Sequence, residues 1–278
     1  ELAELMVGRK VLLSVDKTSS SPKHEILRIE HLNVKDQNGV SRVKDLSFSV
    51  HGGEILGIAG VSGNGQTELL ETLTGIRSFQ GGSIQFGAQK IQSGDKFDAS
   101  LMRDLGVGHV PEDRQRMGLV TSFVAKENAI LGYHRDKAYN STFEMDETFM
   151  LEDCSSKMKD YDVRPANPEL QSSLFSGGNQ QKLVVMREMS RNPELLIVGQ
   201  PTRGVDIGAI EFIHRRIIAM RDAGKAVLLV SVELDEILSL SDRILVMFSG
   251  EMMGEISADE ADERRIGLLM AGIREKAA

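Results

Sequence analysis

A continuous apolar segment that runs into a glycine loop and then a helical pattern constrains the fold more than any other feature. The segment ILGIAG (residues 55–60) leads into GVSGNGQT (residues 60–67), and apolar residues recur at helical spacing over residues 69–76, up to Ile76. A fully apolar run of strand length is typical of a strand covered on both faces of a sheet. The sequence therefore predicts a strand, a loop and a helix, which is the order of a phosphate cradle.

The loop keeps every element of the pattern G-x-x-x-x-G-K-[ST] except its lysine, which is replaced by Gln66. Its glycines permit backbone conformations that aim successive N–H groups at phosphate oxygens. Thr67 keeps the hydroxyl that would face Mg²⁺, as a weak metal ligand. The loop taken alone is also compatible with a plain glycine turn. The residues predicted to bind nucleotide here are Gly60, Ser62, Gly63, Asn64, Gly65, Gln66, Thr67 and Glu68.

Composition excludes several classes of protein. The net charge of −8 argues against general nucleic-acid binding, which usually needs a basic face. Aromatic residues make up 5% of the chain and tryptophan is absent, so a base-stacking platform is not expected. The single cysteine, Cys154, excludes an internal disulfide framework and is interpreted as a spectator thiol. No apolar run approaches the length that spans a bilayer.

The order of strand and helix patterns along the chain predicts an α/β fold. Alternating patterns at residues 25–34 and 43–50 predict strands, whereas residues 97–170 are more polar and helix-like. From Ser176 onward, helical patterns alternate with apolar runs such as LLIV (residues 195–198) and AVLLVS (residues 226–231). This alternation indicates a mostly parallel sheet flanked by helices. The last residues, 258–278, read as a charged helical tail.

A second helix start with anion-binding character follows in LFSGGNQQK (residues 174–182), where a serine precedes two glycines. This stretch closely resembles the signature motif of ATP-binding cassette (ABC) ATPases in its sugar-importer form. In that family the signature closes over nucleotide held by another domain. A capped helix without a ligand is the alternative interpretation. The signature residues implied by the resemblance are Ser176, Gly177, Gly178, Asn179 and Gln180.

Three further stretches match family motifs but depart from them at the chemically important positions. ELLIVGQPTRGVDIGA (residues 194–209) resembles the Walker B strand and the D-loop, and Asp206 matches the D-loop aspartate. Gly199 replaces the aspartate that supports Mg²⁺, and Gln200 replaces the glutamate that acts as general base. An amide cannot accept that proton, and a general base typically contributes ~10²–10⁴-fold in rate. In LLVSVELDE (residues 228–236), Val232 replaces the switch histidine.

GHVPEDR (residues 108–114) resembles the Q-loop, with Glu112 at the glutamine position. Glu112 either offers an oxygen toward Mg²⁺ or is a loop carboxylate in solvent, and both interpretations stay open. His31 is at best a weak substitute for the family's adenine-stacking residue and is otherwise a surface strand residue. The other histidines lack metal-site spacing.

The motifs in family order resemble the second nucleotide-binding domain of the fused ABC ATPases that power bacterial importers of simple sugars and nucleosides. The resemblance implies a P-loop NTPase fold of the ABC-ATPase type, with an antiparallel β subdomain and a helical subdomain near residues 112–170. The expected organisation is a linker or tail of a preceding nucleotide-binding domain at residues 1–24, the nucleotide-binding domain at 25–257 and the tail at 258–278.

The replacements at Gln66, Gly199, Gln200 and Val232 imply that no catalytic side chain is intact. We therefore expect weak ATP and Mg²⁺ binding without turnover, with the signature completing a competent site on the preceding domain of the same polypeptide. The family's other partners are transmembrane permease subunits, reached through residues 110–165, and indirectly an extracytoplasmic solute-binding protein. The implied location is the cytoplasmic face of the bacterial membrane, peripherally bound.

Other functions are weighed against this interpretation. A structural or regulatory module that never binds nucleotide is favoured by Gln66 and Gly199 and opposed by the retained loop glycines and Thr67. The signature argues against a kinase or GTPase. Net acidity and the lack of zinc-type cysteines or a long coiled coil argue against an ABC ATPase of DNA repair or chromosome maintenance.

Overall fold

The structure is a computed structural model that describes residues 17, 19–140 and 144–274. This part of the chain forms two compact units. The helical unit comprises residues 110–192 and 201–213, and the sheet unit comprises the described residues of 14–109, 193–200 and 214–278. Most of the expected preceding tail, residues 1–16 and 18, lies outside the described residues. Lys17 is described, and its Nζ lies 3.5 Å from Asp242 Oδ1 in the sheet unit.

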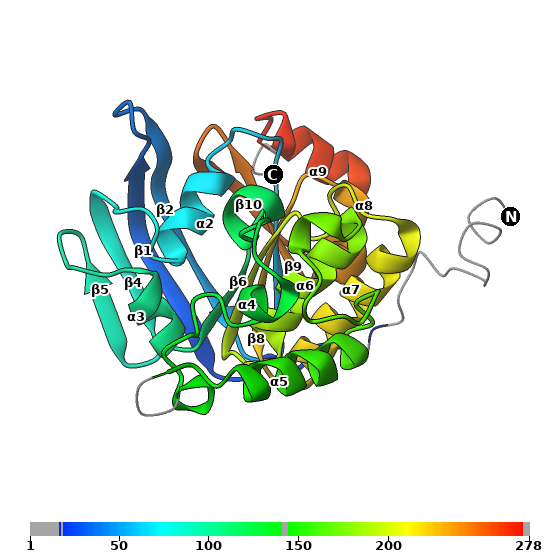
Figure 1. The fold of residues 1–278 in the computed structure, drawn as a ribbon. Coiled ribbons are helices and arrows are strands. Elements are labelled where there is room, and N and C mark those ends of the chain that lie inside the picture. The colour runs from blue at the N-terminus through cyan, green and yellow to red at the C-terminus, as the bar shows by residue number, and fades with distance from the viewer. Residues whose placement is uncertain (1–16, 18, 141–143, 275–278) are drawn as a thin grey trace, which may run out of the picture. The chain divides into compact units, whose positions relative to one another are not determined.

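A six-stranded sheet forms the centre of the sheet unit (Figure 1). Its order is β10 (Glu251–Ser257), β9 (Arg243–Phe248), β3 (Ile55–Ala59), β8 (Ala226–Ser231), β7 (Leu195–Gly199) and β6 (Val107–Val110). Strand β3 pairs in parallel with β8 and β9, β7 pairs in parallel with β8, and only β10 among these pairings is antiparallel. Every residue of β3, β7 and β8 is buried, as expected for strands whose sequences are almost entirely apolar. The predicted mostly parallel α/β sheet is confirmed.

A four-stranded antiparallel sheet completes the sheet unit. Its order is β2 (Ser41–His51), β1 (Glu25–Lys35), β4 (Gly81–Phe86) and β5 (Gln89–Gln92). Buried and exposed side chains alternate along much of β1 and β2, which is the pattern of a sheet with one covered face. Their buried residues join those of β3, β7 and β8 in one hydrophobic cluster, so a single core supports both sheets.

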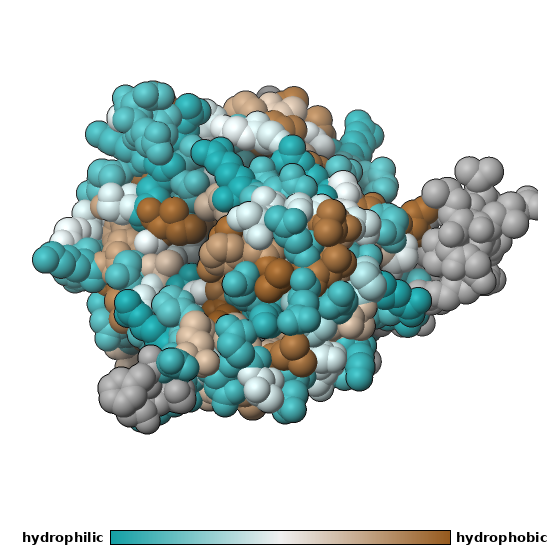
Figure 2. Space-filling model, viewed as in Figure 1, coloured by the Kyte–Doolittle hydropathy of each residue, from teal (hydrophilic) through white to brown (hydrophobic). Residues whose placement is uncertain are grey.

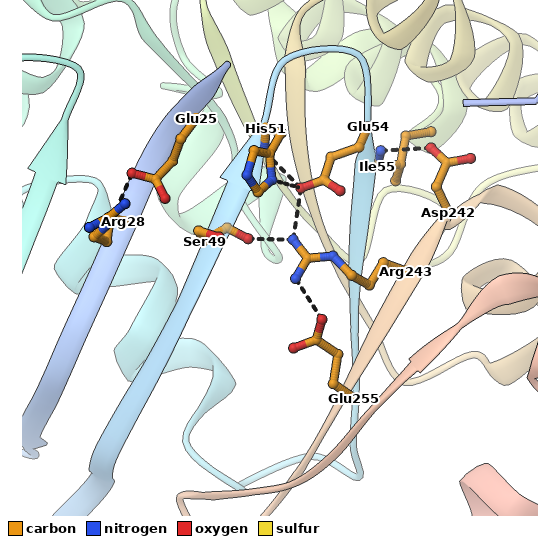
Figure 3. Close-up of polar contacts among 9 residues, drawn as sticks. All are labelled: Glu25, Arg28, Ser49, His51, Glu54, Ile55, Asp242, Arg243 and Glu255. Carbon is orange, nitrogen blue, oxygen red and sulfur yellow. Dashed lines mark hydrogen bonds and ion pairs between the residues drawn. The ribbon is translucent and has the colours of Figure 1, made fainter. Parts of the chain in front are cut away.

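Arg243 joins the two sheets through polar contacts (Figure 3). From β9 its Nη2 donates to Glu54 Oε1 at 2.8 Å and also to the carbonyl of Ser49 on β2, and its Nη1 donates to Glu255 on β10 at 2.7 Å. Glu54 is only 3% exposed and also accepts the backbone N–H of His51 at 2.7 Å. A buried carboxylate needs such partners, so this network fixes the strand before the glycine loop.

The helical unit is organised around α6 (Gly177–Met189), whose residues from Gln180 onward are all buried. Arg187, 5% exposed, pairs with Glu188 at 2.6 Å and donates to the carbonyl of Gly118 at 2.7 Å. Further along, the Arg191 guanidinium lies 4.7 Å from the ring centre of Tyr133 and 5.1 Å from that of Tyr139. Buried charge and cation–π contacts therefore stabilise the C-terminal part of α6 and the residues that follow it.

The remaining helices are listed here with their bounds: α2 (Gln66–Leu73), α3 (Ala99–Asp104), η1 (Arg114–Gly118, a π-helix), α4 (Ala125–Ala129), η2 (Lys137–Tyr139), α5 (Glu147–Asp160), η3 (Ser172–Leu174), α7 (Ile207–Asp222), α8 (Leu234–Leu240), η4 (Ala258–Glu260) and α9 (Glu263–Met270).

The first predicted helix is shorter than its apolar spacing indicated. Helix α2 ends at Leu73, and Ile76 is 49% exposed. Gly75 follows with φ +74°, a left-handed conformation that commonly ends helices. The predicted inclusion of Ile76 in the helix was therefore wrong.

The described surface carries scattered exposed hydrophobic residues. Figure 2 shows one face, on which small hydrophobic groups interrupt a mostly hydrophilic surface. Within the described residues, no helix has both the length and the apolar character needed to cross a membrane.

Candidate functional site

Three of the predicted site positions follow the carboxyl ends of neighbouring parallel strands in the sheet unit. Ala59, which ends β3, pairs with Ser231 at the end of β8, and Gly199, which ends β7, pairs with Val230 of β8. Ligands of open α/β sheets bind at this edge. The structure therefore brings the glycine loop, Gln200 and Val232 to one edge of the sheet.

The glycine loop has the shape of a cradle, and contacts with neighbouring backbone hold it in place. Gly63 (φ +88°) and Gly65 (φ +99°) adopt left-handed conformations, and Gly65 is the N-cap of α2. A Cβ added at Gly65 would lie 2.1 Å from the carbonyl oxygen of Arg42, so only glycine fits there. Asn64 accepts the backbone N–H of Ser249 at 2.9 Å through Oδ1, which ties the loop to the end of β9.

The front of the loop is open. Ser62, Gly63 and Thr67 are exposed, and a Cβ added at Gly63 would meet nothing within 4 Å. Glu68, in the first turn of α2, lies 4.0 Å from the Arg42 guanidinium. Exposed backbone at a helix N-terminus fits a phosphate group, so the shape of this loop suits a nucleotide.

Gln66 is folded back into the loop and is 4% exposed. Its Nε2 donates to the carbonyl of Val61 at 3.3 Å, and a Cβ added at Gly60 would come within 2.4 Å of the same nitrogen. The amide thus satisfies the loop's own backbone and adds no positive charge. A lysine here would add a charge-assisted hydrogen bond to phosphate, worth about 1.5–3 kcal/mol.

Gln200 and Val232 contact each other instead of forming an acid–base pair. Gln200 is 8% exposed, has a left-handed backbone (φ +46°) and accepts the backbone N–H of Val232 at 3.3 Å through Oε1. Gly199 adds no side chain, so these positions offer neither a carboxylate nor an imidazole. Within the described residues, no group of three or more His, Cys, Asp or Glu side chains is placed to hold a metal ion. The loop carries the exposed hydroxyls of Ser62 and Thr67, whereas Mg²⁺ usually takes one or two carboxylates as well.

The signature lies in the helical unit and begins α6 as predicted. Ser176 is its N-cap, and its Oγ accepts from the N–H of Asn179 at 3.4 Å and from Asn179 Nδ2 at 3.0 Å. Asn179 Oδ1 in turn accepts the N–H of Arg164 at 2.8 Å. The buried Gln180 donates to the carbonyl of Ser172 at 3.0 Å. These contacts hold the helix start with its exposed serine facing outward.

The D-loop packs against the signature glycines within the helical unit. A Cβ added at Gly178 would lie 2.7 Å from Asp206 Oδ2 and 3.2 Å from the Cβ of Ala209. Asp206 Oδ1 accepts the N–H of Ala209 at 2.9 Å, so the predicted D-loop aspartate is a capping residue at the start of α7. Gly178 is therefore required for close packing of the two segments.

Arg114 is a residue of this region whose role sequence reasoning missed. Its Nη1 donates to the carbonyl of Arg203 at 2.7 Å and its Nη2 to the carbonyl of Gly204 at 3.2 Å. Burial lowers the pKa of Arg114, and Asp113 partly offsets this, but arginine stays protonated at neutral pH. The signal in the sequence was an arginine two positions after Glu112, with nothing to indicate its distant acceptors.

The structure also locates two further residues singled out from the sequence, Glu112 and His31. Glu112 is partly exposed in the helical unit, before the π-helix η1. His31 is exposed on β1 with φ +52°, and its Nδ1 lies 2.7 Å from Asp45 Oδ1. The prediction that His31 is a surface strand residue is confirmed.

The sequence is similar to those of known ATP-binding proteins. A family model described as ABC transporter matches residues 43–203. The chain is 46% identical over 278 residues to the guanosine import ATP-binding protein NupO of Bacillus subtilis, covering 100% of this chain and 54% of that protein. It is 45% identical to the nucleoside import ATP-binding protein NupA of Lactococcus lactis, covering 98% of this chain and 53% of that protein. The chain thus spans about half the length of the curated relatives it matches.

Solved structures show the same fold. A nucleotide-free ATP-binding cassette from an ABC transporter superposes with a TM-score of 0.71 and 21% identity, covering 89% of this chain and 96% of that one. A bacterial ABC transporter cassette solved as a dimer gives a TM-score of 0.70 and 20% identity, covering 84% and 99%. At this identity the likeness establishes the arrangement of strands and helices, and the predicted fold class is confirmed.

Proposed function

The chain belongs to the ABC transporter family of ATP-binding domains, and from this premise we propose that it is the second nucleotide-binding domain of an importer ATPase for nucleosides or simple sugars. The named relatives support an import role, and nucleoside importers are among the most similar of them. The match to about half of each relative supports a position beside another nucleotide-binding domain.

We propose that the phosphate loop of this domain holds nucleotide weakly and without turnover. The observation that carries this is the combination of an open backbone cradle with uncharged residues at positions 66, 199, 200 and 232. When bound, ATP with Mg²⁺ supplies the phosphoanhydride bond that an intact site hydrolyses. Thr67 and, less directly, Glu112 are the side chains proposed to face the metal, while the loop backbone holds the phosphates.

The signature is proposed to complete the competent site of the preceding domain. Ser176 and Gly177 stand at an exposed helix start whose shape is held by Asn179 and Asp206. Backbone N–H groups at such an end stabilise phosphate charge. Hydrolysis at the partner's site would then depend on the signature residues of this chain, which lie outside its own phosphate loop.

A permease is the proposed membrane partner, which would place the chain at the cytoplasmic face of the membrane. Phe123 and Leu174, 42% and 67% exposed, support this as apolar anchors of the helical unit. They lie on adjacent segments, since Val124 and Gln171 form an antiparallel bridge. Exposed apolar side chains of this size are typical of interaction surfaces. A solute-binding protein would act on the far side of the permease.

Titration of this chain with Mg²⁺ and ATP, beside the Gln66→Lys variant, tests the proposal for the phosphate loop. We expect weak binding by the natural chain, about 10-fold or more tighter binding by the variant, and almost no hydrolysis by either. Robust Mg²⁺-dependent hydrolysis by the natural chain would overturn the proposal. Absence of binding by both proteins would favour the structural or regulatory module that takes no nucleotide.

The signature is tested in the full-length ATPase that contains this chain. Ser176→Ala removes the hydroxyl that caps α6 at an exposed residue. We expect hydrolysis to fall by about 10²-fold, as for the loss of one preorganised donor. An unchanged rate would refute the role of this signature in the partner's site.

A further inference from the structure

Arg114 lies where three separate segments of the helical unit meet. It is the last residue of the Q-loop stretch and the first residue of the π-helix η1. Its guanidinium donates to two consecutive carbonyls, those of Arg203 at 2.7 Å and Gly204 at 3.2 Å, in the D-loop stretch. The forked, planar donors of arginine match two such acceptors, which a single ammonium group cannot do.

The same guanidinium lies against the signature. A Cβ added at Gly177 would be 2.6 Å from Arg114 Nη2 and 3.0 Å from the carbonyl oxygen of Gly204. The first residue of α6 is therefore in close contact with both the arginine and the D-loop carbonyl that it binds. The absence of a side chain at Gly177 is what lets the three segments approach this closely.

The next residue, Gln115, adds a second contact between this stretch and the signature helix. Gln115 Nε2 donates to Gln180 Oε1 at 3.0 Å, and Gln180 is buried on α6. Arg114, which ends the Q-loop stretch, thus binds the D-loop, and Gln115, which follows it, binds the signature helix. A displacement of this stretch would move both segments together.

We propose that Arg114 is a positioning residue that couples the Q-loop, the D-loop and the signature, so that the signature takes its active shape only while the guanidinium holds both segments. This rests on the proposed role of the signature in a partner's site. Arg114 itself touches backbone of this chain and is not proposed to contact nucleotide.

Hydrogen exchange in the 278-residue chain tests the coupling without any ATPase measurement. Arg114→Met should accelerate exchange by about tenfold in both residues 176–183 and residues 202–208, because two hydrogen bonds to the D-loop and the contact with Gly177 are lost together. Arg116→Met is the matched control, since Arg116 is exposed on the same π-helix, and it should change neither segment. Unchanged exchange in either segment of Arg114→Met would overturn the coupling.

A double-mutant cycle makes the test independent of a general loss of stability. Gly177→Ala adds a methyl group against Arg114, so it should perturb exchange less in the Arg114→Met background than in the natural one. Additive effects would overturn a direct contact. If Arg114→Met does not fold, Arg114→Lys serves in its place, and it should restore protection only in part because one ammonium cannot bind both carbonyls in the same geometry.

The full-length ATPase then separates this inference from the proposed function. Arg114→Met should lower kcat about tenfold with less than a twofold change in KM for ATP, because the partner's own loop holds the nucleotide. If Ser176→Ala lowers turnover and Arg114→Met does not, the coupling fails while the signature role stands. If neither lowers turnover, the proposed function fails, and the exchange data alone decide the coupling.

Discussion

Helices α2 and α6 both begin at an end built for an anion, yet different parts of the chain hold the two ends in place. The start of α2 depends on backbone: Gly65 lies against the carbonyl of Arg42, and the side chain of Gln66 bonds back to its own loop. The start of α6 depends on side chains, with Ser176 and Asn179 bonded to each other and Arg114 beside Gly177.

This difference explains how the start of α2 can lose its catalytic side chains while the start of α6 keeps its geometry. The cradle tolerates replacement of its lysine, because the close backbone approach at Gly65 and the Asn64 bond to Ser249 need no charge at position 66. A helix start held by side chains has no such freedom, since each replacement would also alter its geometry. Four predictions test this contrast, beginning with the largest expected effect.

Arg187→Met should have the largest effect on stability. It removes a buried charge that supports α6 and leaves Glu188, 4% exposed, without its ion-pair partner. Breaking a buried pair typically costs about 3–5 kcal/mol. Urea unfolding gives the measurement, with Arg264→Met on the exposed face of α9 as the control, expected within about 0.5 kcal/mol of the natural chain. A loss below about 1 kcal/mol for Arg187→Met would show that side chains do not anchor α6.

Gly65→Ala should be the next most costly, at about 3 kcal/mol, because the new methyl group meets the backbone of Arg42 and the left-handed φ adds strain. Gly63→Ala has the same type of φ but open space around its Cβ, so its cost should be about 1 kcal/mol. Thermal or urea unfolding compares the pair. Equal losses would mean that strain alone, and not backbone approach, fixes the cradle.

Gln66→Met keeps the volume of the side chain but removes its hydrogen bond to Val61. Its cost should be about 1 kcal/mol. Affinity for ATP should not fall, because the backbone donors stay in place. Isothermal titration checks this, and a loss of affinity of tenfold or more would show that the Gln66 amide shapes the cradle.

The smallest expected signal is the reactivity of Cys154. Burial raises the pKa of the Cys154 thiol to about 12, so almost no thiolate exists at pH 8. A maleimide should therefore label the native chain very slowly. Labelling should accelerate in Arg187→Met, which loosens the helical unit that contains Cys154, and should stay slow in Gly65→Ala. Equal acceleration in both variants would mean that the two units open together.

Sequence patterns predicted the parts of the fold in which local and tertiary preferences agree. The buried strands β3, β7 and β8 and the helix α6 formed at the predicted places. Strand β5, QKIQ, contains one buried residue, Ile91, so its pattern was too short to recognise. Strand β10 pairs along β9 with few buried side chains, and such an edge strand is specified by its partner more than by its own sequence.

The candidate site likewise has features that the sequence predicted and features that it did not. Residue types and spacing identified the loop and the signature, because backbone anion sites need glycine at fixed positions. The internal bond of Gln66 and the contact between Gln200 and Val232 depend on side-chain directions that a sequence does not contain. Arg114 binds carbonyls about 90 residues away, and carbonyls exist at every position, so no pattern indicates which ones it meets.

The placement of the tyrosines along the chain also has a spectroscopic consequence. The chain has three tyrosines and no tryptophan, and all three (Tyr133, Tyr139 and Tyr161) belong to the helical unit. Emission from the native chain excited at the tyrosine band therefore comes from that unit alone. A tryptophan introduced into the sheet unit would give it a separate emission, and energy transfer from tyrosine would then report the distance between the two units in solution.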